Sequence, residues 1–535
     1  MKTNPNRFWL IVILLGWVFD FLFWKKPGGV NFFLYVILVL ATGITLLQTD
    51  GLRLSRRGGL LLLPILFLAF MTFVRLEGMT VFLSAAMSIF LIGVFALTYT
   101  GGNWMHYGMM DYFLGYLTLF GSMIARPLGF AAEVKRDQPE ASPKRNVWPV
   151  VRGIVIALPV IAIFASLLSS ADLIFAKRFE EFVDLFNIEN LPEYIFRLVY
   201  ILVFAYAIAG AFLHAAQKSD DQVDAKARVP SFLGFTESTI VLGSVVILFA
   251  VFVIIQFQYF FGGQANINIE GFTYSEYARR GFGELVAVAF FSLLMLLGLG
   301  GITKRETEMQ RRVFSTLGFV LVGLVIVMQI SAFQRLVLYE NAYGFSRLRT
   351  YTHVFMIWLA ILLVAVAVLE FLKKERVIGF ALVLASLGFV LSLGLLNVDA
   401  FIVRQNIQRE IRGQAETPTD TVDNARGGRV ELDSQYFITL SDDAIPALVE
   451  GFQNKALPAS EKEKIGAALA CKRHEHELDR ERPWQGFHLS HFYADRAFAS
   501  IKKALDTYEI TPVDWYMQVT TPGGEEFSCS PYYFD

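Results

Sequence analysis

Three charged residues in the middle of the chain have the spacing of an acid–base ladder. Glu276, Arg280 and Glu284 follow one another at intervals of four residues, in a segment that leads into a long apolar run. On a helix this spacing places the three side chains on one face, where opposite charges attract. Ionisable groups at the edge of a bilayer are costly and usually paired. The ladder is either a polar site at the mouth of a membrane protein or a structural salt-bridge ladder.

A second polar segment joins two later apolar runs. Arg335, Tyr339 and Tyr343 would share one helical face, and Arg347 and Arg349 follow before the next run begins. A guanidinium binds a carboxylate or a phosphate through two parallel hydrogen bonds. The arginines could therefore bind an anionic headgroup. Arg and Tyr also anchor helix ends among lipid headgroups, and this alternative stays open.

We group these residues with others at loops predicted to face outward, and we call the set the polar belt. We expect the belt to dock the C-terminal tail or to bind an anionic lipid or a glycan. Asp20, at the outer end of the first apolar run, could pair with its arginines. The polar belt comprises Asp172, Glu276, Arg279, Arg280, Glu284, Arg335, Tyr339, Glu340, Tyr343, Arg347 and Arg349.

Four histidines in the tail form two close pairs, His474 with His476 and His488 with His491. The four could bind zinc if the pairs met in space. Residues two apart on a helix point to different faces, which places His474 and His476 poorly for one ion. We therefore expect a solvated polar helix and predict no metal and no cofactor. No nucleophile elbow, H-E-x-x-H, Walker loop or dinucleotide fingerprint is present, so no catalytic residue is assigned.

The elements that must carry these residues are apolar helices. The chain has 535 residues, of which 55% are hydrophobic and 18% are charged, and a helix crosses a bilayer with about 20 apolar residues. An all-α membrane protein is predicted, a polytopic bundle of eleven or twelve transmembrane helices with a small, mainly helical C-terminal soluble domain. The twelfth segment, 109–125, carries Asp111 and is predicted to be interfacial. The predicted spans are about 8–24, 31–48, 59–75, 79–99, 150–170, 197–216, 239–260, 285–301, 315–333, 352–371 and 377–396.

Hydropathy and charge divide the chain into four predicted parts. Residues 1–131 hold four spans and the interfacial helix, and 132–148 form a cytoplasmic linker. Residues 149–398 hold seven spans, and 399–535 form the soluble domain. Helical patterns in that domain cover about 399–411, 441–454, 460–478 and 490–508, before a terminal hairpin with a Pro-Gly-Gly turn.

The loops and the cysteines indicate an orientation. Cytoplasmic loops are rich in lysine and arginine. With eleven spans and a cytoplasmic N-terminus, the inner segments hold roughly twice as many of these residues as the outer loops. Cys471 and Cys529 are the only cysteines, and both lie in the tail. They predict a disulfide in an oxidising compartment, with two unrelated buried thiols as the alternative.

Several segments resemble a known family. YSEYARRGFGELVAV, FQRLVLYENAYGFSRLRTYTHVFMIWLA, NVDAFIVRQNIQR and YFITLSDDAIPALV are similar to bacterial membrane proteins grouped as domain of unknown function 4173, and SADLIFAKRFEEF looks similar too. Group 4153 is related. The resemblance runs from roughly residue 150 to 450. It implies a polytopic bacterial membrane protein and supplies no reaction, substrate or catalytic residue.

The predicted function is that of a non-enzymatic scaffold, sensor or accessory subunit of the cell envelope. It would lie in the bacterial cytoplasmic (inner) membrane, with the C-terminal domain outside. Predicted partners are the lipid bilayer, an anionic lipid or glycan, and another membrane protein. Nucleic acid is excluded because a net charge of −1 gives no basic field. The alternatives are a secondary transporter with Glu284 and Asp20 on its path, and an intramembrane enzyme acting on a lipid-linked substrate.

Overall fold

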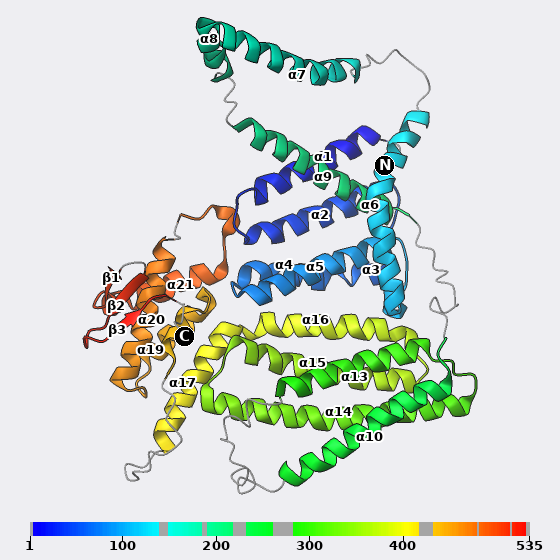
Figure 1. Cartoon of the computed structure of the whole chain (residues 1–535), viewed down its shortest axis with the longest axis vertical. Helices are drawn as coiled ribbons and strands as arrows, with labels where there is room; N and C mark the ends of the chain where they lie inside the picture. Colours follow the sequence, from blue (N-terminus) through cyan, green and yellow to red (C-terminus); the bar gives the residue numbers. More distant parts are fainter. Residues whose placement is uncertain are drawn as a thin grey trace. The chain divides into compact units, whose positions relative to one another are not determined.

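Long apolar helices make up most of the chain in the computed structural model (Figure 1). The structure describes residues 4–137, 148–184, 190–217, 232–260, 282–416, 432–478, 481–513 and 516–530. Within these residues, eleven helices are long and apolar enough to cross a membrane, which confirms the predicted fold class. They are α1 (Pro5–Phe23), α2 (Val30–Thr49), α3 with α4 (Arg56–Gly59 and Leu62–Val74), α5 (Gly78–Thr98), α6 (Met109–Asp137), α9 (Leu191–Ala215), α10 (Phe235–Phe260), α13 (Phe282–Ile302), α14 (Glu308–Tyr343), α15 (Arg347–Phe371) and α16 (Ile378–Leu396).

Ten of these helices coincide with predicted spans. The eleventh is α6, which extends well beyond the interfacial helix predicted at 109–125. The span predicted at 150–170 corresponds to α7 (Trp148–Ala171), which is followed by α8 (Leu173–Asp184). Neither is among the eleven helices found in the described residues. All eleven predicted spans therefore lie on helices, and α6 is a further apolar helix of spanning length.

The chain divides into two compact units. One comprises Met1–Lys25, Leu38–Leu54 and Leu117–Lys218, and the other comprises Lys26–Ile37, Ser55–Tyr116 and Ser219–Asp535. Each unit combines segments from both sides of the predicted linker 132–148. In the first unit, α1 packs against α9. In the second, α13, α14, α15 and α16 form a layered bundle with α10, and α4 packs against α5 (Figure 1).

The contacts of α6 lie near helix ends in both units. In the second unit, the Tyr112 hydroxyl donates to the carbonyl of Trp104, which lies in η1 (Trp104–His106) just after α5. In the first unit, Ser122 contacts His214 in the last turn of α9, and the Phe130 ring contacts Phe8 in the first turn of α1. α1 and α9 are antiparallel, so those two turns lie at the same end of the pair. The length and composition of α6 permit a crossing, and the interfacial position of 109–125 stays a prediction.

The C-terminal part of the second unit is mainly helical. α17 (Val398–Glu416) directly follows α16, and a small antiparallel sheet of order β1-β2-β3 closes the fold. The predicted terminal hairpin corresponds to β2 and β3, and β1 adds a third strand. The remaining elements are α18 (Ser434–Ile438), η5 (Asp442–Ala444), α19 (Ile445–Gln453), α20 (Ala459–Leu478), η6 (Trp484–Gly486), α21 (Leu489–Ser500), α22 (Lys502–Leu505), β1 (Glu509–Val513), β2 (Tyr516–Thr520) and β3 (Glu526–Ser528).

The apolar core of the tail continues into the membrane helices. Ile402 and Val403 of α17 are fully buried with Leu448 of α19 and Leu469 of α20, and the same cluster includes Leu393 near the end of α16. Burial of apolar surface stabilises packing by about 25 cal/mol per Å². The tail is therefore fixed to the helix ends by a continuous core.

Candidate functional site at the junction of the tail and the helix ends

Among the residues that the structure describes, the tail contacts four short connections at the ends of membrane helices in its own unit. These are the turn after α4, the turn between α14 and α15, the turn between α16 and α17, and the loop before α2. The turn after α14 forms at Gly344, whose φ of +80° is unfavourable for other residues. The polar residues that hold the tail there are called the tail junction: Arg75, Glu77, Arg347, Asp399, Ser441, Asp443 and Ser490.

Asp399 is the centre of the tail junction. It is 0% exposed and lies in the first turn of α17. Arg347, the first residue of α15, donates from Nε to Asp399 Oδ1 at 2.8 Å and from Nη2 to Oδ2 at 2.6 Å. Ser441 donates to Oδ2 from its backbone nitrogen at 2.6 Å and from its hydroxyl at 2.7 Å. One buried carboxylate thus joins a membrane helix to the tail through four hydrogen bonds.

Asp443 makes a second connection, to the turn between α4 and α5. Its Oδ2 accepts from the backbone nitrogens of Leu76 at 2.7 Å and Glu77 at 3.1 Å. The Ser490 hydroxyl lies within hydrogen-bonding distance of Asp443 Oδ1, and Arg75 Nη1 is 4.0 Å from the same oxygen. Burial raises the pKa of the Asp443 carboxyl, whereas the hydrogen bonds from Ser490 and Leu76 and the charge of Arg75 oppose the rise. The tail thereby supplies an acceptor for the orphan donors of this turn.

Glu77 connects two membrane helices beside this contact. Its carboxylate accepts from the backbone nitrogens of Met79 and Thr80, both at 2.8 Å, and so caps α5. It also accepts a hydrogen bond from the Tyr351 hydroxyl of α15. An acidic side chain at a helix N-terminus is stabilised by the helix dipole. Displacement of the tail would therefore disturb the ends of α5 and α15 together.

Other residues of the polar belt gather at the same end of α14 and α15. The Arg349 guanidinium lies 4.2 Å from the centroid of the Tyr339 ring, which contacts the Tyr343 ring at 4.8 Å. Glu340 is 1% exposed, with His353 Nδ1 at 3.2 Å from its Oε1. Arg335 is 8% exposed within α14. Glu340 and Arg335 are therefore buried within the bundle, whereas Tyr343 is exposed.

The remaining residues of the polar belt are Asp172, Glu276, Arg279, Arg280 and Glu284. Glu284 is exposed in the first turn of α13, and Glu276, Arg279 and Arg280 lie outside the described residues. Asp172 belongs to the other unit, where its Oδ1 accepts from the nitrogens of Ile174 and Phe175 at the start of α8.

Asp20, the predicted partner of the belt's arginines, also belongs to the other unit. It accepts hydrogen bonds from Arg197 of α9, with Nε at 3.1 Å and 3.2 Å from its two oxygens. This carboxylate therefore has a guanidinium partner inside its own unit. Arg197 was not among the candidate residues predicted from the sequence.

A cavity of about 950 Å³ opens in the tail, and three of its lining residues form a compact cluster. Asp442 Oδ2 lies 2.7 Å from Nδ1 of His476 and 2.7 Å from Nδ1 of His491. On the other side of its ring, His476 Nε2 lies 3.0 Å from Asp495 Oδ1. Burial acts against it, but the hydrogen bonds from both histidines hold the pKa of Asp442 well below its usual range. The hydrogen bond to Asp442 raises the pKa of His476.

This cluster corrects the prediction that the tail histidines lie on a solvated helix face. His476 is buried and His491 is half-buried, because α20 and α21 both pack beside η5. His474 lines the same cavity but does not belong to the cluster, as expected from its position two residues from His476. His488 instead approaches the first loop, with Nε2 at 2.8 Å from the Gly28 carbonyl.

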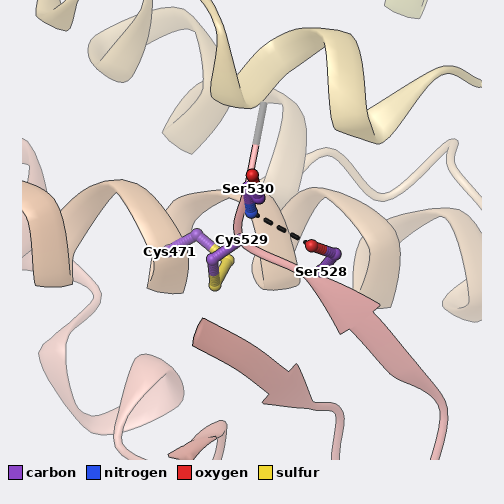
Figure 2. Close-up of a disulfide and its surroundings, with 4 residues drawn as sticks. All are labelled: Cys471, Ser528, Cys529 and Ser530. Carbon is purple, nitrogen blue, oxygen red and sulfur yellow. Dashed lines mark hydrogen bonds between the residues drawn. A yellow bond between two sulfur atoms is a disulfide. The ribbon is translucent and has the colours of Figure 1, made fainter. Parts of the chain in front are cut away.

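The two cysteines are joined in a disulfide beside the cavity. Figure 2 shows Cys471 of α20 bonded to Cys529, which follows β3, with 5.3 Å between the Cα atoms. The Cys529 nitrogen donates to the carbonyl of Met517 in β2 at 2.8 Å, and the Ser530 nitrogen donates to Ser528 Oγ at 3.1 Å. The bond ties the terminal sheet to the helix that carries His476.

A family model described as Domain of unknown function (DUF4153) matches residues 62–451. It is the group noted above as related to group 4173. The match includes Arg347, Asp399 and Asp443, and it ends within α19, before His476, His491 and the disulfide. No curated protein and no solved structure matches the chain.

Proposed function

Because the chain belongs to the DUF4153 family, a domain of unknown function, we propose its role from the geometry of the tail junction. The protein is a multi-pass membrane protein. In the proposed role it holds its own C-terminal domain against the ends of its membrane helices, as a non-enzymatic scaffold, sensor or accessory subunit of the cell envelope. The residues that perform this docking are those of the tail junction.

The observation that carries the proposal is the shared carboxylate of Asp399. Arg347 approaches it from a membrane helix and Ser441 approaches it from the later part of the tail, so one carboxylate bonds to both parts. Removal of one partner from a buried pair costs about 3–5 kcal/mol. This shared carboxylate holds the tail in one position and couples the position of the tail to that of α15. Both properties suit a scaffold or a sensor.

The engagement of Arg347 favours docking over the binding of an anionic lipid or glycan. The Arg347 guanidinium already donates to both oxygens of Asp399. A phosphate or carboxylate ligand would need the same bidentate geometry. In this proposal the bilayer and another envelope membrane protein remain the partners. The polar-belt residue that takes part in this docking is Arg347, through its hydrogen bonds to Asp399.

We place the tail on the outer side of the bacterial cytoplasmic membrane. The disulfide supports this, because such bonds persist in oxidising compartments. Basic residues at the opposite ends of the same helices also support it, since cytoplasmic segments are rich in lysine and arginine. These residues are Arg56 and Arg57 before α4, Arg311 and Arg312 in α14, and Lys373 after α15.

The test is Arg347→Ala in cells that lack the wild-type protein. We expect normal insertion and abundance and faster proteolysis of the tail in isolated membranes. We also expect the variant gene to fail to restore the normal phenotype, which the wild-type gene restores. The matched control is Arg404→Ala, which removes an exposed ion pair between α17 and Glu450 of α19. Wild-type protection and wild-type function in Arg347→Ala, at normal abundance, would refute the docking role.

A further inference from the structure

Two histidines and one aspartate converge in the wall of the tail cavity. His476 comes from α20, His491 from α21 and Asp442 from η5, and one ligand atom of each lies within 4.8 Å of the other two. We propose that Asp442, His476 and His491 bind a divalent transition-metal ion, with Zn²⁺ as the best fit. This inference is independent of the docking role and of the side of the membrane on which the tail lies.

The three side chains offer a set of donor atoms that suits Zn²⁺. Two imidazole nitrogens and one carboxylate oxygen are ligands that Zn²⁺ takes at about 2.0–2.2 Å, and sites with three protein ligands leave a position for water. Tetrahedral geometry at those bond lengths separates ligand atoms by about 3.3 Å. Each histidine Nδ1 lies 2.7 Å from Asp442 Oδ2. An ion would therefore need each histidine nitrogen to move about 0.6 Å away from the Asp442 oxygen, and the two histidine nitrogens already lie within 4.8 Å of each other.

The far side of the His476 ring makes a contact that is typical of a metal-binding histidine. With Nδ1 facing Asp442, Nε2 lies 3.0 Å from Asp495 Oδ1. Metal-binding histidines commonly donate their other ring N–H to a carboxylate, which fixes the tautomer and makes the ligand nitrogen more basic. Asp495 stands in that position. It points to a ligand role for Nδ1 independently of the convergence of the three residues.

The surroundings hold the three ligands on packed elements. Leu469 of α20 and Ala494 of α21 are fully buried in the tail core. Lys472 also lines the cavity, and its ammonium donates to the carbonyls of Ile438 and Leu440, which leaves Asp442 Oδ2 to the histidines. Metal sites on helices are positioned more accurately than sites on loops.

The competing arrangement is a hydrogen-bonded network without a metal. His476, protonated on both nitrogens, would then bridge Asp442 and Asp495 as a cation. The two arrangements use the same contacts and differ in one measurable property, which is stoichiometric uptake of Zn²⁺. The full-length protein in nanodiscs, stripped with a chelator and dialysed, is titrated with ZnCl₂ by calorimetry, and its metal content is measured by mass spectrometry.

We expect one Zn²⁺ per chain in the wild type and none in His476→Ala or His491→Ala. Asp495→Asn, which keeps all three ligands, should bind about 10–100-fold more weakly. His474→Ala is the matched control, because it lies on the same helix and lines the same cavity outside the cluster. Thermal unfolding of each variant shows whether the tail still folds.

Two results would overturn the metal site. One is a stripped wild-type protein that takes up no Zn²⁺, which would leave a hydrogen-bonded network only. The other is equal uptake by the wild type and by folded His476→Ala and His491→Ala, which would place the ion elsewhere. If an alanine variant unfolds, the test is the comparison of the Zn²⁺ affinities of Asp495→Asn and His474→Ala. Equal Zn²⁺ affinity in these two variants also contradicts the proposal.

Discussion

At the scale of single residues, the tail depends on a few buried carboxylates that receive hydrogen bonds from both sides. Asp399, Asp443 and Glu77 are each at most 5% exposed. An unsatisfied buried polar group costs more than a satisfied one contributes. Loss of one donor should therefore be measurable even where the backbone keeps its place.

Ser441→Ala tests this dependence with a minimal change. It removes the hydroxyl that donates to Asp399 at 2.7 Å and keeps the backbone N–H that donates at 2.6 Å. A hydrogen bond to a charged group contributes about 1.5–3 kcal/mol, so hydrogen exchange of the α18 and α19 amides should accelerate accordingly. Ser500→Ala, which removes an exposed hydroxyl bonded within α21, should leave exchange unchanged. Equal exchange in both variants would contradict the role of Ser441.

The sequence indicated Arg347 as a residue that could bind an anionic group such as a lipid headgroup, but it did not indicate Asp399 as the partner. Asp399 is 52 residues away, and the pair Tyr351–Glu77 spans 274 residues. Sequence spacing indicates contacts between residues of one helix. It gives no information on contacts between residues that are this far apart in the sequence. The available signal was weaker: Asp399 directly follows an apolar run and Glu77 lies between two, so each is a charge at a helix end. His476 and His491 were considered together as possible zinc ligands, but their common partner Asp442 was missed for the same reason, because it belongs to a third element.

At the scale of elements, apolar runs predicted ten of the eleven apolar helices, because a bilayer demands length and hydropathy that the sequence shows directly. α6 was placed less well. Asp111 and Pro127 reduce its apolar signal, and Ser122 of this helix contacts His214 of α9, which is distant in the sequence. Such contacts are tertiary and leave no periodic signature.

The loop before α2 offers an element-scale test of docking. Its backbone runs against η6, where Val30 N donates to Phe487 O at 3.0 Å. A Cβ on Gly29 would lie 2.7 Å from the Gly486 carbonyl carbon, whereas a Cβ on Gly28 would meet nothing within 4 Å. Gly29→Ala should therefore destabilise the loop contact by about 1–3 kcal/mol. Accelerated hydrogen exchange at Val30 measures this.

Gly28→Ala is the control for that experiment, since it has the same added volume in open space. It should exchange as the wild type does. Similar rates at Val30 in both alanine variants would show that the close approach of the two backbones does not hold the loop.

At the scale of the whole molecule, orientation is the property that a single experiment can fix. With Cys471 and Cys529 bonded and no other cysteine in the chain, a membrane-impermeant maleimide should label intact cells only after reduction. A Cys471→Ser/Cys529→Ser double variant gives the background. Labelling that needs cell lysis rather than reduction would place the tail in the cytoplasm and contradict the proposed orientation.

The position of Asp399 also implies an order of biogenesis. Ser441 and Asp443 leave the ribosome after α4, α5, α14 and α15. Only then can these two residues form their hydrogen bonds at the ends of those helices. Until the tail has been delivered and folded, Arg347 can meet Asp399 but the turn at Leu76 and Glu77 lacks its acceptor. A nascent chain arrested before residue 441 would thus carry an open, polar patch at its helix ends. That patch would distinguish unfinished chains from finished ones for the proteases and chaperones of the membrane.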